Sequence, residues 1–342
     1  MKQYFTLQWH LTDNCDQRCK HCYIYQRKDV FYQGLPIETL ELILDDFITF
    51  CKKTDKYPSI SLTGGDPLLY RSFWDLTELL RKKKIYFNIL GNSFHLSPET
   101  AKKLKDKGCQ HYQMSIDGMK ETHDFLRKQG SFDDTLNKIS CINNAGLRSV
   151  IMTTVSRVNA NQITDIIELA VKYKVSKFAF ARYCPNHNEG ENIMSPVEYK
   201  ELLENCWNTF SKYKDQRATL FVLKDHLWKL FLYEKGMLSI DTNNDYIADG
   251  CHCAISHMTL LPDGTIYACR RFESPVGKVP EMTFFDIFKN EEMEKYRQFN
   301  MFEACSKCPV LNYCRGCPAV SFGVSGTFYS KDPQCWYKHN NI

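Results

Sequence analysis

The chain has 342 residues, of which 43% are hydrophobic, so it is long enough to bury a large core and to form more than one packed unit. Its 44 basic and 40 acidic residues leave a formal net charge of +4, an excess too small to indicate nucleic-acid binding. The sequence contains neither an apolar run of about 18 residues nor a secretory signal at its start. We therefore expect a cytoplasmic protein that binds neither nucleic acid nor a membrane.

Short apolar runs rich in β-forming residues alternate with helical patterns in the first half of the chain. Six such runs predict strands, at residues 5–12, 59–64, 86–92, 111–117, 148–155 and 178–183. Strands that are separated by helices pair in parallel through right-handed crossovers, so the pattern predicts a parallel sheet or an incomplete (β/α) barrel. Ligand-binding residues are then expected where the strands end.

The pattern changes twice in the second half. From about residue 196 to 247 it becomes helical after the start signal Ser195-Pro196, and we interpret its aromatic residues Trp207, Phe210 and Trp228 as core contacts. After Gly250, cysteine, glycine and proline become frequent, and the segments flanking residues 262–264 predict a β-hairpin. These changes predict three parts, at residues 1–185, 186–249 and 250–342.

Sixteen cysteines in a chain without a secretory signal indicate metal binding or reactive thiols rather than disulfides. Three of them lie between Cys15 and Cys22, and eight lie between Cys251 and Cys335. We interpret the other five as buried structural thiols, although Cys184 follows the sixth predicted strand: Cys51, Cys109, Cys141, Cys184 and Cys206.

The first group, Cys15, Cys19 and Cys22, follows the first predicted strand with the spacing Cys-x3-Cys-x2-Cys. Three thiolates leave one iron of a four-iron cluster without a protein ligand, and that iron can bind the amino and carboxylate groups of S-adenosylmethionine (SAM). A zinc site with His10 or His21 as a fourth ligand is the alternative that these cysteines alone leave open.

A second segment, Thr63-Gly64-Gly65-Asp66-Pro67, falls at the end of the second predicted strand. Alone it would be an ordinary turn. After the cysteine loop, however, it resembles the signature of the radical SAM family, in which this segment binds the amino group of the SAM methionine. Asp66 replaces the usual glutamate; Gly64 and Gly65 permit close backbone approach, and Asp66 offers an acceptor to an ammonium group.

The resemblance implies further contacts and a reaction. The positions at which the family contacts the SAM ribose and carboxylate are Asn92, Ser115, Asp117 and Arg127, each of which alone could be a turn or surface residue. The implied fold is a six-unit partial barrel. In the implied reaction a reduced cluster cleaves SAM to methionine and a 5′-deoxyadenosyl radical, which takes a hydrogen atom from the substrate.

The second group of cysteines resembles the SPASM extension of radical SAM enzymes, except that two residues separate Cys314 from Cys317 where three are usual. The resemblance implies three [4Fe-4S] clusters in all. One auxiliary cluster would be held by Cys251, Cys253, Cys269 and Cys317, and the other by Cys305, Cys308, Cys314 and Cys335. Two alternatives stay open: a zinc ribbon of Cys305, Cys308, Cys314 and Cys317, and ligation by only one of Cys251 and Cys253.

Enzymes of this architecture mostly modify peptides, so we predict a maturase that forms a thioether or another crosslink in a ribosomally made peptide. A small-molecule dehydrogenase and an anaerobic sulfatase-type maturase are alternatives. In sulfatase-type maturases an acidic residue that acts as base follows the hairpin cysteine, whereas Arg270 and Arg271 follow Cys269 here. These two arginines could hold an acidic peptide. A non-catalytic iron–sulfur carrier is a third alternative. Expected partners are a flavodoxin or ferredoxin as reductant and, since only 14 residues precede Cys15, a separate leader-binding protein.

Overall fold

The computed structural model describes the chain except residues 1–2, 27–29, 187–189, 242–246 and 339–342. It forms two compact units, each built from separate stretches of the chain. Unit 1 comprises Met1–Ser115, His123–Val150 and Cys253–Arg297. Unit 2 comprises Ile116–Thr122, Ile151–His252 and Gln298–Ile342. The division at residues 185 and 249 stays a prediction, because it follows chain order and the compact units do not.

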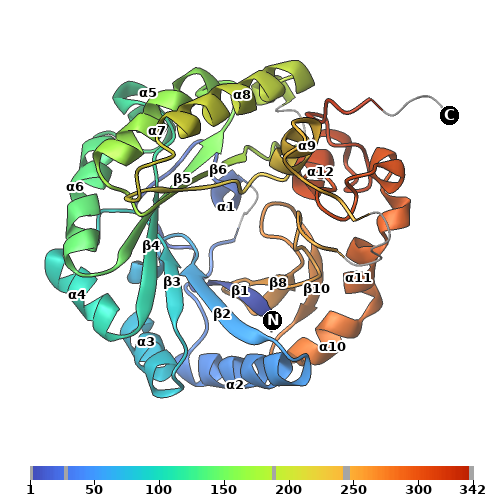
Figure 1. Cartoon of the computed structure of the whole chain (residues 1–342). Helices are drawn as coiled ribbons and strands as arrows, with labels where there is room; N and C mark the ends of the chain where they lie inside the picture. Colours follow the sequence, from blue (N-terminus) through green and yellow to red (C-terminus); the bar gives the residue numbers. More distant parts are fainter. Residues whose placement is uncertain (1–2, 27–29, 187–189, 242–246, 339–342) are drawn as a thin grey trace. The chain divides into compact units, whose positions relative to one another are not determined.

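Parallel strands form the centre of unit 1, where the strand order is β10-β9-β8-β1-β2-β3-β4. The first three of these are β10 (Pro275–Lys278), β9 (Thr265–Tyr267) and β8 (His257–Leu260). The strands β1 (Tyr4–His10), β2 (Tyr57–Thr63), β3 (Phe87–Leu90) and β4 (Cys109–Ser115) pair in parallel. Their connections contain α2 (Ile37–Lys53), α3 (Phe73–Lys82) and α4 (Pro98–Asp106), which Figure 1 shows along the outer side of the strands. The first four predicted strands are therefore confirmed.

The predicted hairpin is also present in unit 1. Strands β8 (His257–Leu260) and β9 (Thr265–Tyr267) are antiparallel, and β8 pairs in parallel with β1. The sequence did not predict this pairing, which joins a C-terminal segment to the N-terminal strand. The helix α10 (Phe284–Lys289) then packs on α2, where the rings of Phe47 and Phe284 are in edge contact with centroids 5.3 Å apart.

Unit 2 combines helices with short strands. Strands β6 (Lys177–Arg182) and β7 (Leu220–Val222) are parallel, and Ser195 caps α8 (Pro196–Lys212) in a capping box with Glu198, as its start signal predicts. The ring of Trp228 packs against those of Trp207, Phe210 and Phe231, so the expected core role of these aromatics is confirmed. The short strand β7 was not predicted, because two of its three side chains are exposed.

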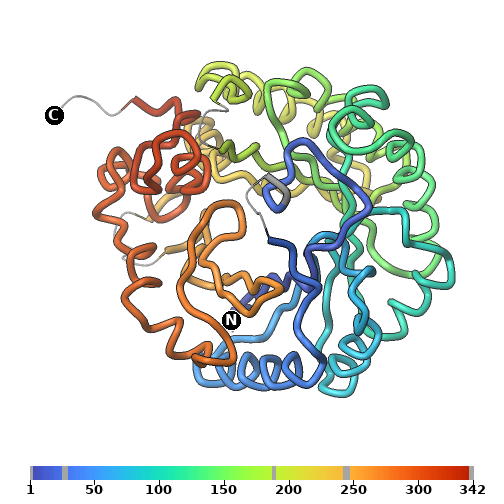
Figure 2. Tube along the Cα trace, turned by 180° about the vertical axis from the view of Figure 1, so that it is seen from behind, coloured from blue at the N-terminus to red at the C-terminus, as the bar shows by residue number. Residues whose placement is uncertain are grey.

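The remaining elements are short or connect the strands. They are α1 (Tyr23–Gln26), α5 (Lys120–Leu126), α6 (Ser131–Asn144), β5 (Arg148–Val155), α7 (Ile163–Lys172), α9 (Leu227–Glu234), β10 (Pro275–Lys278), α11 (Glu291–Glu294) and α12 (Pro318–Ser325). The segment of unit 2 that precedes α12 contains the 3-10 turns Phe299–Met301 and Ala304–Lys307, and Figure 2 shows the red end of the chain winding in tight turns. Such a stretch can place several cysteines around one point without regular structure.

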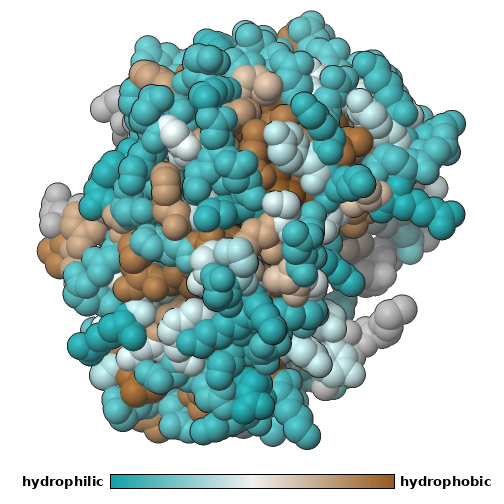
Figure 3. Space-filling model, turned by 90° about the vertical axis from the view of Figure 1, so that its left-hand side faces the viewer, coloured by the Kyte–Doolittle hydropathy of each residue, from teal (hydrophilic) through white to brown (hydrophobic). Residues whose placement is uncertain are grey.

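On the face shown in Figure 3 most side chains are hydrophilic, and hydrophobic ones gather in limited areas. None of the helices in the described part of the chain has the length and apolar content needed to cross a bilayer.

Candidate active site and metal centres

The first cysteine group lies in a loop that folds back on itself after β1. The backbone amide of Cys22 donates to the carbonyl of Cys19 at 3.0 Å, and the amide of Gln17 donates to the sulfur of Cys15 at 3.4 Å. The loop is anchored to the end of α5, because the amide of Lys20 donates to the carbonyl of Leu126 at 2.8 Å. The three thiols therefore belong to one short, internally bonded segment.

The Gly-Gly-Asp-Pro segment seats this loop on the end of β2. The amide of Gly65 donates to the carbonyl of Thr12, and the amide of Asp66 donates to the carbonyl of Asn14, both at 2.7 Å. A Cβ atom on Gly64 would lie 2.2 Å from the carbonyl oxygen of Thr12, and one on Gly65 would lie 2.1 Å from that of Asn14. The close approach that these glycines permit is thus to the cysteine loop; approach to SAM stays a prediction.

Asp66 is fully buried and links three segments of unit 1. Its Oδ1 accepts from the amide of Leu68 at 2.8 Å, and its Oδ2 accepts from the amide of Asn92 at 2.9 Å. Burial raises the pKa of Asp66 to about 6, against the effect of these two hydrogen bonds. Each carboxylate oxygen retains a lone pair for a further donor, so the residue can still bind an ammonium group.

Two more predicted SAM contacts touch the cysteine loop directly. The side-chain amide of Asn92 donates to Oδ1 of Asp16 at 2.7 Å and lies 3.8 Å from the sulfur of Cys15. The guanidinium of Arg127 lies 3.8 Å from the sulfur of Cys19. The structure thus brings Asp66, Asn92 and Arg127 to the loop that carries the three cysteines.

Sequence reasoning missed Tyr112 on β4, whose hydroxyl donates to the backbone carbonyl of Asn92 at 2.8 Å. Its place on β4 gave no signal, because the partner belongs to the neighbouring strand end.

The remaining two predicted contacts lie at the end of β4. Ser115 is the last residue of the strand and belongs to unit 1. Asp117 belongs to unit 2, where it is buried and its Oδ1 accepts from the amide of Thr154 at 2.7 Å. The roles of Ser115 and Asp117 toward SAM stay predictions.

The donor set in this loop suits an iron–sulfur cluster. Burial, with a smaller effect from the charge of Asp66, raises the pKa of Cys15 to about 12. A thiol of this kind becomes a thiolate only when a cation such as iron is present to stabilise the charge. Cys15, Cys19 and Cys22 would hold the cluster, and the acceptor Asp66 beside them suits the amino group of an amino-acid ligand.

A tyrosine, a histidine and an arginine lie beside the loop in unit 1. The hydroxyl of Tyr23 is 3.2 Å from Nε2 of His10, and the guanidinium of Arg270 lies 5.8 Å from the centroid of the Tyr23 ring. Burial raises the pKa of Tyr23 to about 12, the Arg270 charge opposes the shift, and the charges of Cys22 and Cys269 add to it. Tyr23 therefore lies near cysteines from both predicted cluster groups; its only sequence signal is its position directly after Cys22.

Four C-terminal cysteines line one cavity in unit 2. They are Cys305, Cys308, Cys314 and Cys335, and Arg315 lines the same cavity. Burial raises the pKa of Cys305 to about 12, with smaller contributions from the charges of Cys335 and Cys308. These four residues are one of the two predicted ligand sets. Among the described residues, no three His, Cys, Asp or Glu side chains are arranged to hold a single metal ion.

Cys317 has other neighbours. Burial by itself would lower the pKa of His226. A hydrogen bond to Cys251 and the charges of Cys251 and Cys317 outweigh this effect, so the pKa of His226 is raised overall. Cys317 thus shares a neighbour with Cys251, whereas Cys335 shares the cavity with Cys305. Of the other two predicted ligands of this set, Cys253 and Cys269 belong to unit 1, and the complete set stays a prediction.

Comparison with known families agrees with the order of these segments. Residues 9–170 match the radical SAM superfamily, and residues 251–309 match SPASM, an iron–sulfur cluster-binding domain. The chain is a radical SAM enzyme with a C-terminal SPASM domain. It therefore uses SAM with a [4Fe-4S] cluster, and its SPASM region carries auxiliary iron–sulfur binding.

The radical SAM enzyme is similar to curated proteins over nearly its whole length. It is 26% identical to an AdoMet-dependent heme synthase of Nitratidesulfovibrio vulgaris, over 96% of this chain and 91% of that protein. It is 24% identical to the mycofactocin maturase MftC of Mycolicibacterium smegmatis, over 96% of this chain and 82% of that protein.

Solved structures share its fold. Streptococcus suis SuiB bound to precursor peptide SuiA has a TM-score of 0.77 at 18% identity, covering 98% of this chain and 77% of that one. The structure of anSMEcpe with bound AdoMet and Cp18Cys peptide has a TM-score of 0.75 at 18% identity, covering 96% and 93%. The predicted fold class, an α/β partial barrel followed by a SPASM region, is confirmed.

Proposed function

We propose that this radical SAM enzyme is a peptide maturase that forms a thioether or another crosslink in a ribosomally made peptide. The observation that carries the proposal is that two proteins with the same fold over at least 96% of this chain bind peptides. The similarity to a mycofactocin maturase also supports a role as a maturase.

The residues of the first site have separate tasks in this proposal. Cys15, Cys19 and Cys22 hold the cluster, while Asp66 and the backbone of Gly64 and Gly65 hold the amino group of SAM. Asn92, Ser115, Asp117 and Arg127 hold its ribose and carboxylate. When bound, the cluster and SAM supply a 5′-deoxyadenosyl radical. Asp66 and Asn92 are buried, so little water reaches these two side chains.

Formation of a thioether removes two hydrogen atoms from the peptide. One hydrogen atom leaves a peptide carbon for the 5′-deoxyadenosyl radical, one proton leaves the cysteine thiol, and the new carbon–sulfur bond releases one electron. When bound, an auxiliary cluster would supply the acceptor for that electron. We assign two of them, with the ligand sets Cys251, Cys253, Cys269 and Cys317, and Cys305, Cys308, Cys314 and Cys335. A flavodoxin or ferredoxin would reduce the first cluster, and a separate protein would bind a leader peptide.

Arg270 is the residue that we assign to a carboxylate on the peptide. Its guanidinium carbon lies 5.8 Å from the centroid of the Tyr23 ring. It also follows Cys269 directly, where a sulfatase-type enzyme would need an acidic base, so this position favours anion binding over base catalysis.

A second candidate substrate is a porphyrin, because the heme synthase similarity extends over 96% of this chain. A porphyrin with carboxylate side chains would also suit Arg270. The two candidates differ in the product and not in the first step, since both require cleavage of SAM. A small-molecule dehydrogenase would likewise cleave SAM but would modify neither substrate.

The experiment is an anaerobic incubation of the reconstituted enzyme with SAM, dithionite and one of two probes. The first is the product of any short cysteine-containing reading frame that sequencing finds beside the gene, and the second is Fe-coproporphyrin III. We expect 5′-deoxyadenosine together with a peptide that has lost two hydrogen atoms, located by tandem mass spectrometry. Conversion of the porphyrin instead would overturn the peptide assignment, and absence of 5′-deoxyadenosine with both probes would overturn the SAM chemistry.

A matched pair of variants tests Arg270. Arg270→Gln should raise the KM for a peptide that carries Asp or Glu about tenfold, as expected for loss of one charge-assisted contact. Arg271→Gln removes the same charge one residue away and should have a smaller effect. Equal effects of the two variants would contradict the assignment.

A further inference from the structure

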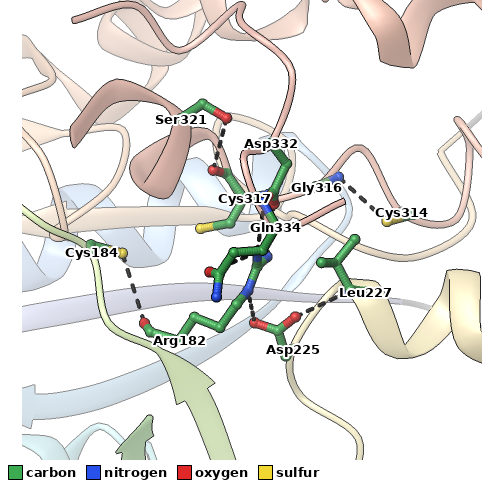
Figure 4. A network of polar contacts seen from close by, with 10 residues as sticks. All are labelled: Arg182, Cys184, Asp225, Leu227, Cys314, Gly316, Cys317, Ser321, Asp332 and Gln334. Atoms are coloured by element: carbon green, nitrogen blue, oxygen red, sulfur yellow. Dashed lines mark hydrogen bonds and ion pairs between the residues drawn. The ribbon is translucent and has the colours of Figure 1, made fainter. Parts of the chain in front are cut away.

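A buried ionic network joins strand β6 to the cysteine-rich end of unit 2. The side chain of Arg182, the last residue of β6, is 1% exposed. Its Nε donates to Oδ2 of Asp225 at 2.9 Å, and its Nη1 and Nη2 donate to the two carboxylate oxygens of Asp332 at 2.7 and 2.8 Å (Figure 4). One guanidinium thus binds two buried carboxylates, one of them in a bidentate manner.

Stability alone gives little reason for such a network. Burial of charges is costly, and a buried ion pair replaced by apolar residues of similar volume is often neutral or stabilising. Here one positive and two negative side chains are buried together, which leaves one negative charge without a cation among these three residues. Burial alone would raise the pKa of Asp225, but the charges of Arg182 and His226 lower it, so this carboxylate stays ionised.

Asp332 extends the network to cysteines of both predicted auxiliary sites. Its Oδ2 accepts from the amide of Cys317 at 2.7 Å, and its backbone carbonyl accepts from the amide of Cys335 at 3.0 Å. Gly316 packs directly on it, since a Cβ there would lie 2.7 Å from Cβ of Asp332. The amide of Gly316 in turn donates to the sulfur of Cys314 at 3.3 Å. One aspartate therefore fixes the backbone next to three predicted ligands.

We propose that Asp332, held by Arg182, is a positioning residue shared by the two auxiliary iron–sulfur sites. Its carboxylate sets the position of Cys317 and its backbone sets the position of Cys335, so that the ligand geometry of both sites depends on one side chain bound to β6. The proposal rests on the cluster assignment given above. Asp332 is not itself a cluster ligand, and the spacing of the cysteines does not predict it. Hydrogen-bonded partners of metal ligands commonly affect metal retention in this way.

Asp225 provides a matched control within the same network. It is buried and bound to Arg182 like Asp332, but its other oxygen accepts from the amide of Leu227, at the start of α9, at 3.0 Å. Asp332→Asn and Asp225→Asn each remove one buried negative charge and keep the volume of the side chain. Each leaves Arg182 paired with one carboxylate, so neither leaves an isolated buried charge.

The experiment uses full-length enzyme in two backgrounds that each retain one auxiliary cluster. Cys15, Cys19 and Cys22 are replaced by alanine in both, together with Cys269→Ala in one background and Cys305→Ala in the other. Iron content and the electron paramagnetic resonance spectrum of the reduced cluster are measured in each. If a background holds no cluster before Asp332 is changed, the ligand assignment itself fails, and this proposal fails with it.

We expect Asp332→Asn to alter the spectrum in both backgrounds and to weaken iron retention about 10- to 100-fold, as for other hydrogen-bonded partners of metal ligands. Asp225→Asn should leave the spectrum of the cluster held by Cys305, Cys308, Cys314 and Cys335 unchanged. Parent-like spectra and iron content for Asp332→Asn in both backgrounds would overturn the proposal. The proposal would also be overturned if Asp225→Asn changed the spectrum of the cluster held by Cys305, Cys308, Cys314 and Cys335 in the same way as Asp332→Asn.

A third variant covers the case in which Asp332→Asn does not fold. Arg182→Lys keeps every charge, but an ammonium group cannot reproduce the bidentate contact with Asp332 and the contact with Asp225 together. We expect folded protein, shown by circular dichroism, with broadened spectra from both auxiliary clusters. Unchanged spectra in folded Arg182→Lys would overturn the proposal independently.

Discussion

The replacement of Gly65 by alanine should detach the first cysteine loop from the sheet. The new Cβ would lie 2.1 Å from the carbonyl oxygen and 2.5 Å from the carbonyl carbon of Asn14, and 2.6 Å from the carbonyl oxygen of Asp13. All three are backbone atoms, so no side-chain rotation can relieve the contact. The backbone conformation of Gly65 itself is one that alanine can adopt, so the effect should be purely steric.

The magnitude follows from the contacts that must move. Overpacking of this kind costs about 1–3 kcal/mol. Displacement of the loop would also break the hydrogen bonds from the amides of Gly65 and Asp66, each worth about 0.5–1.5 kcal/mol net. Together these terms reach roughly 2 to 6 kcal/mol, enough to favour a displaced loop over the native one.

The assay is iron content with SAM binding by equilibrium dialysis. If three four-iron clusters form, Gly65→Ala should lose about four of about twelve irons and most of its SAM affinity. Gly190→Ala is the control, because a Cβ there meets nothing within 4 Å. Parent levels of iron and SAM affinity in Gly65→Ala would refute the reasoning, and equal losses in Gly190→Ala would show a nonspecific effect.

Three further predictions concern the metal sites and SAM. Anaerobic reconstitution should give about twelve irons per chain, and replacement of Cys15, Cys19 and Cys22 by alanine should remove about four; four irons with stoichiometric zinc would contradict the auxiliary assignment. SAM affinity should fall as the pH drops below about 6, where Asp66 becomes protonated, and Asp66→Asn should bind weakly without this dependence; the same titration in the variant would exclude Asp66 as its cause. Cys317→Ala should disturb the same cluster as Cys269→Ala and leave 5′-deoxyadenosine formation intact while product is lost. Spectral loss that matches that of Cys305→Ala would instead favour ribbon-like pairing of Cys317 with Cys305, Cys308 and Cys314.

The raised pKa of Asp66 also has a consequence for folding. Because the pKa is about 6 in the folded chain against 3.8 ordinarily, the protonated carboxyl favours the folded state. This contribution, up to about 3 kcal/mol, is fully present below pH 3.8 and is lost as the pH rises through 6. Bound SAM would offset the loss, since its ammonium stabilises the ionised carboxylate.

The sequence by itself determined those strands and binding motifs that are encoded within short stretches of the chain. Hydrophobic runs separated by helical patterns gave the strands β1 to β6, because strand and helix periodicities are properties of short segments. The spacing of Cys15, Cys19 and Cys22 and the Gly-Gly-Asp-Pro turn after β2 gave the family, because three thiols in one loop and a turn at a strand end are each encoded within a few residues.

The tertiary structure alone decided which distant residues meet. The pairing of β8 with β1, the contact of Tyr23 with His10 and Arg270, and the Asp332 contacts with Cys317 and Cys335 have no periodic or spacing signal. The sequence likewise marked Gly64 and Gly65 as positions of close backbone approach, but only the structure shows that they approach the backbone of Thr12 and Asn14. Such contacts form between segments whose separation along the chain carries no information about distance in space, so only packing of the whole unit selects them.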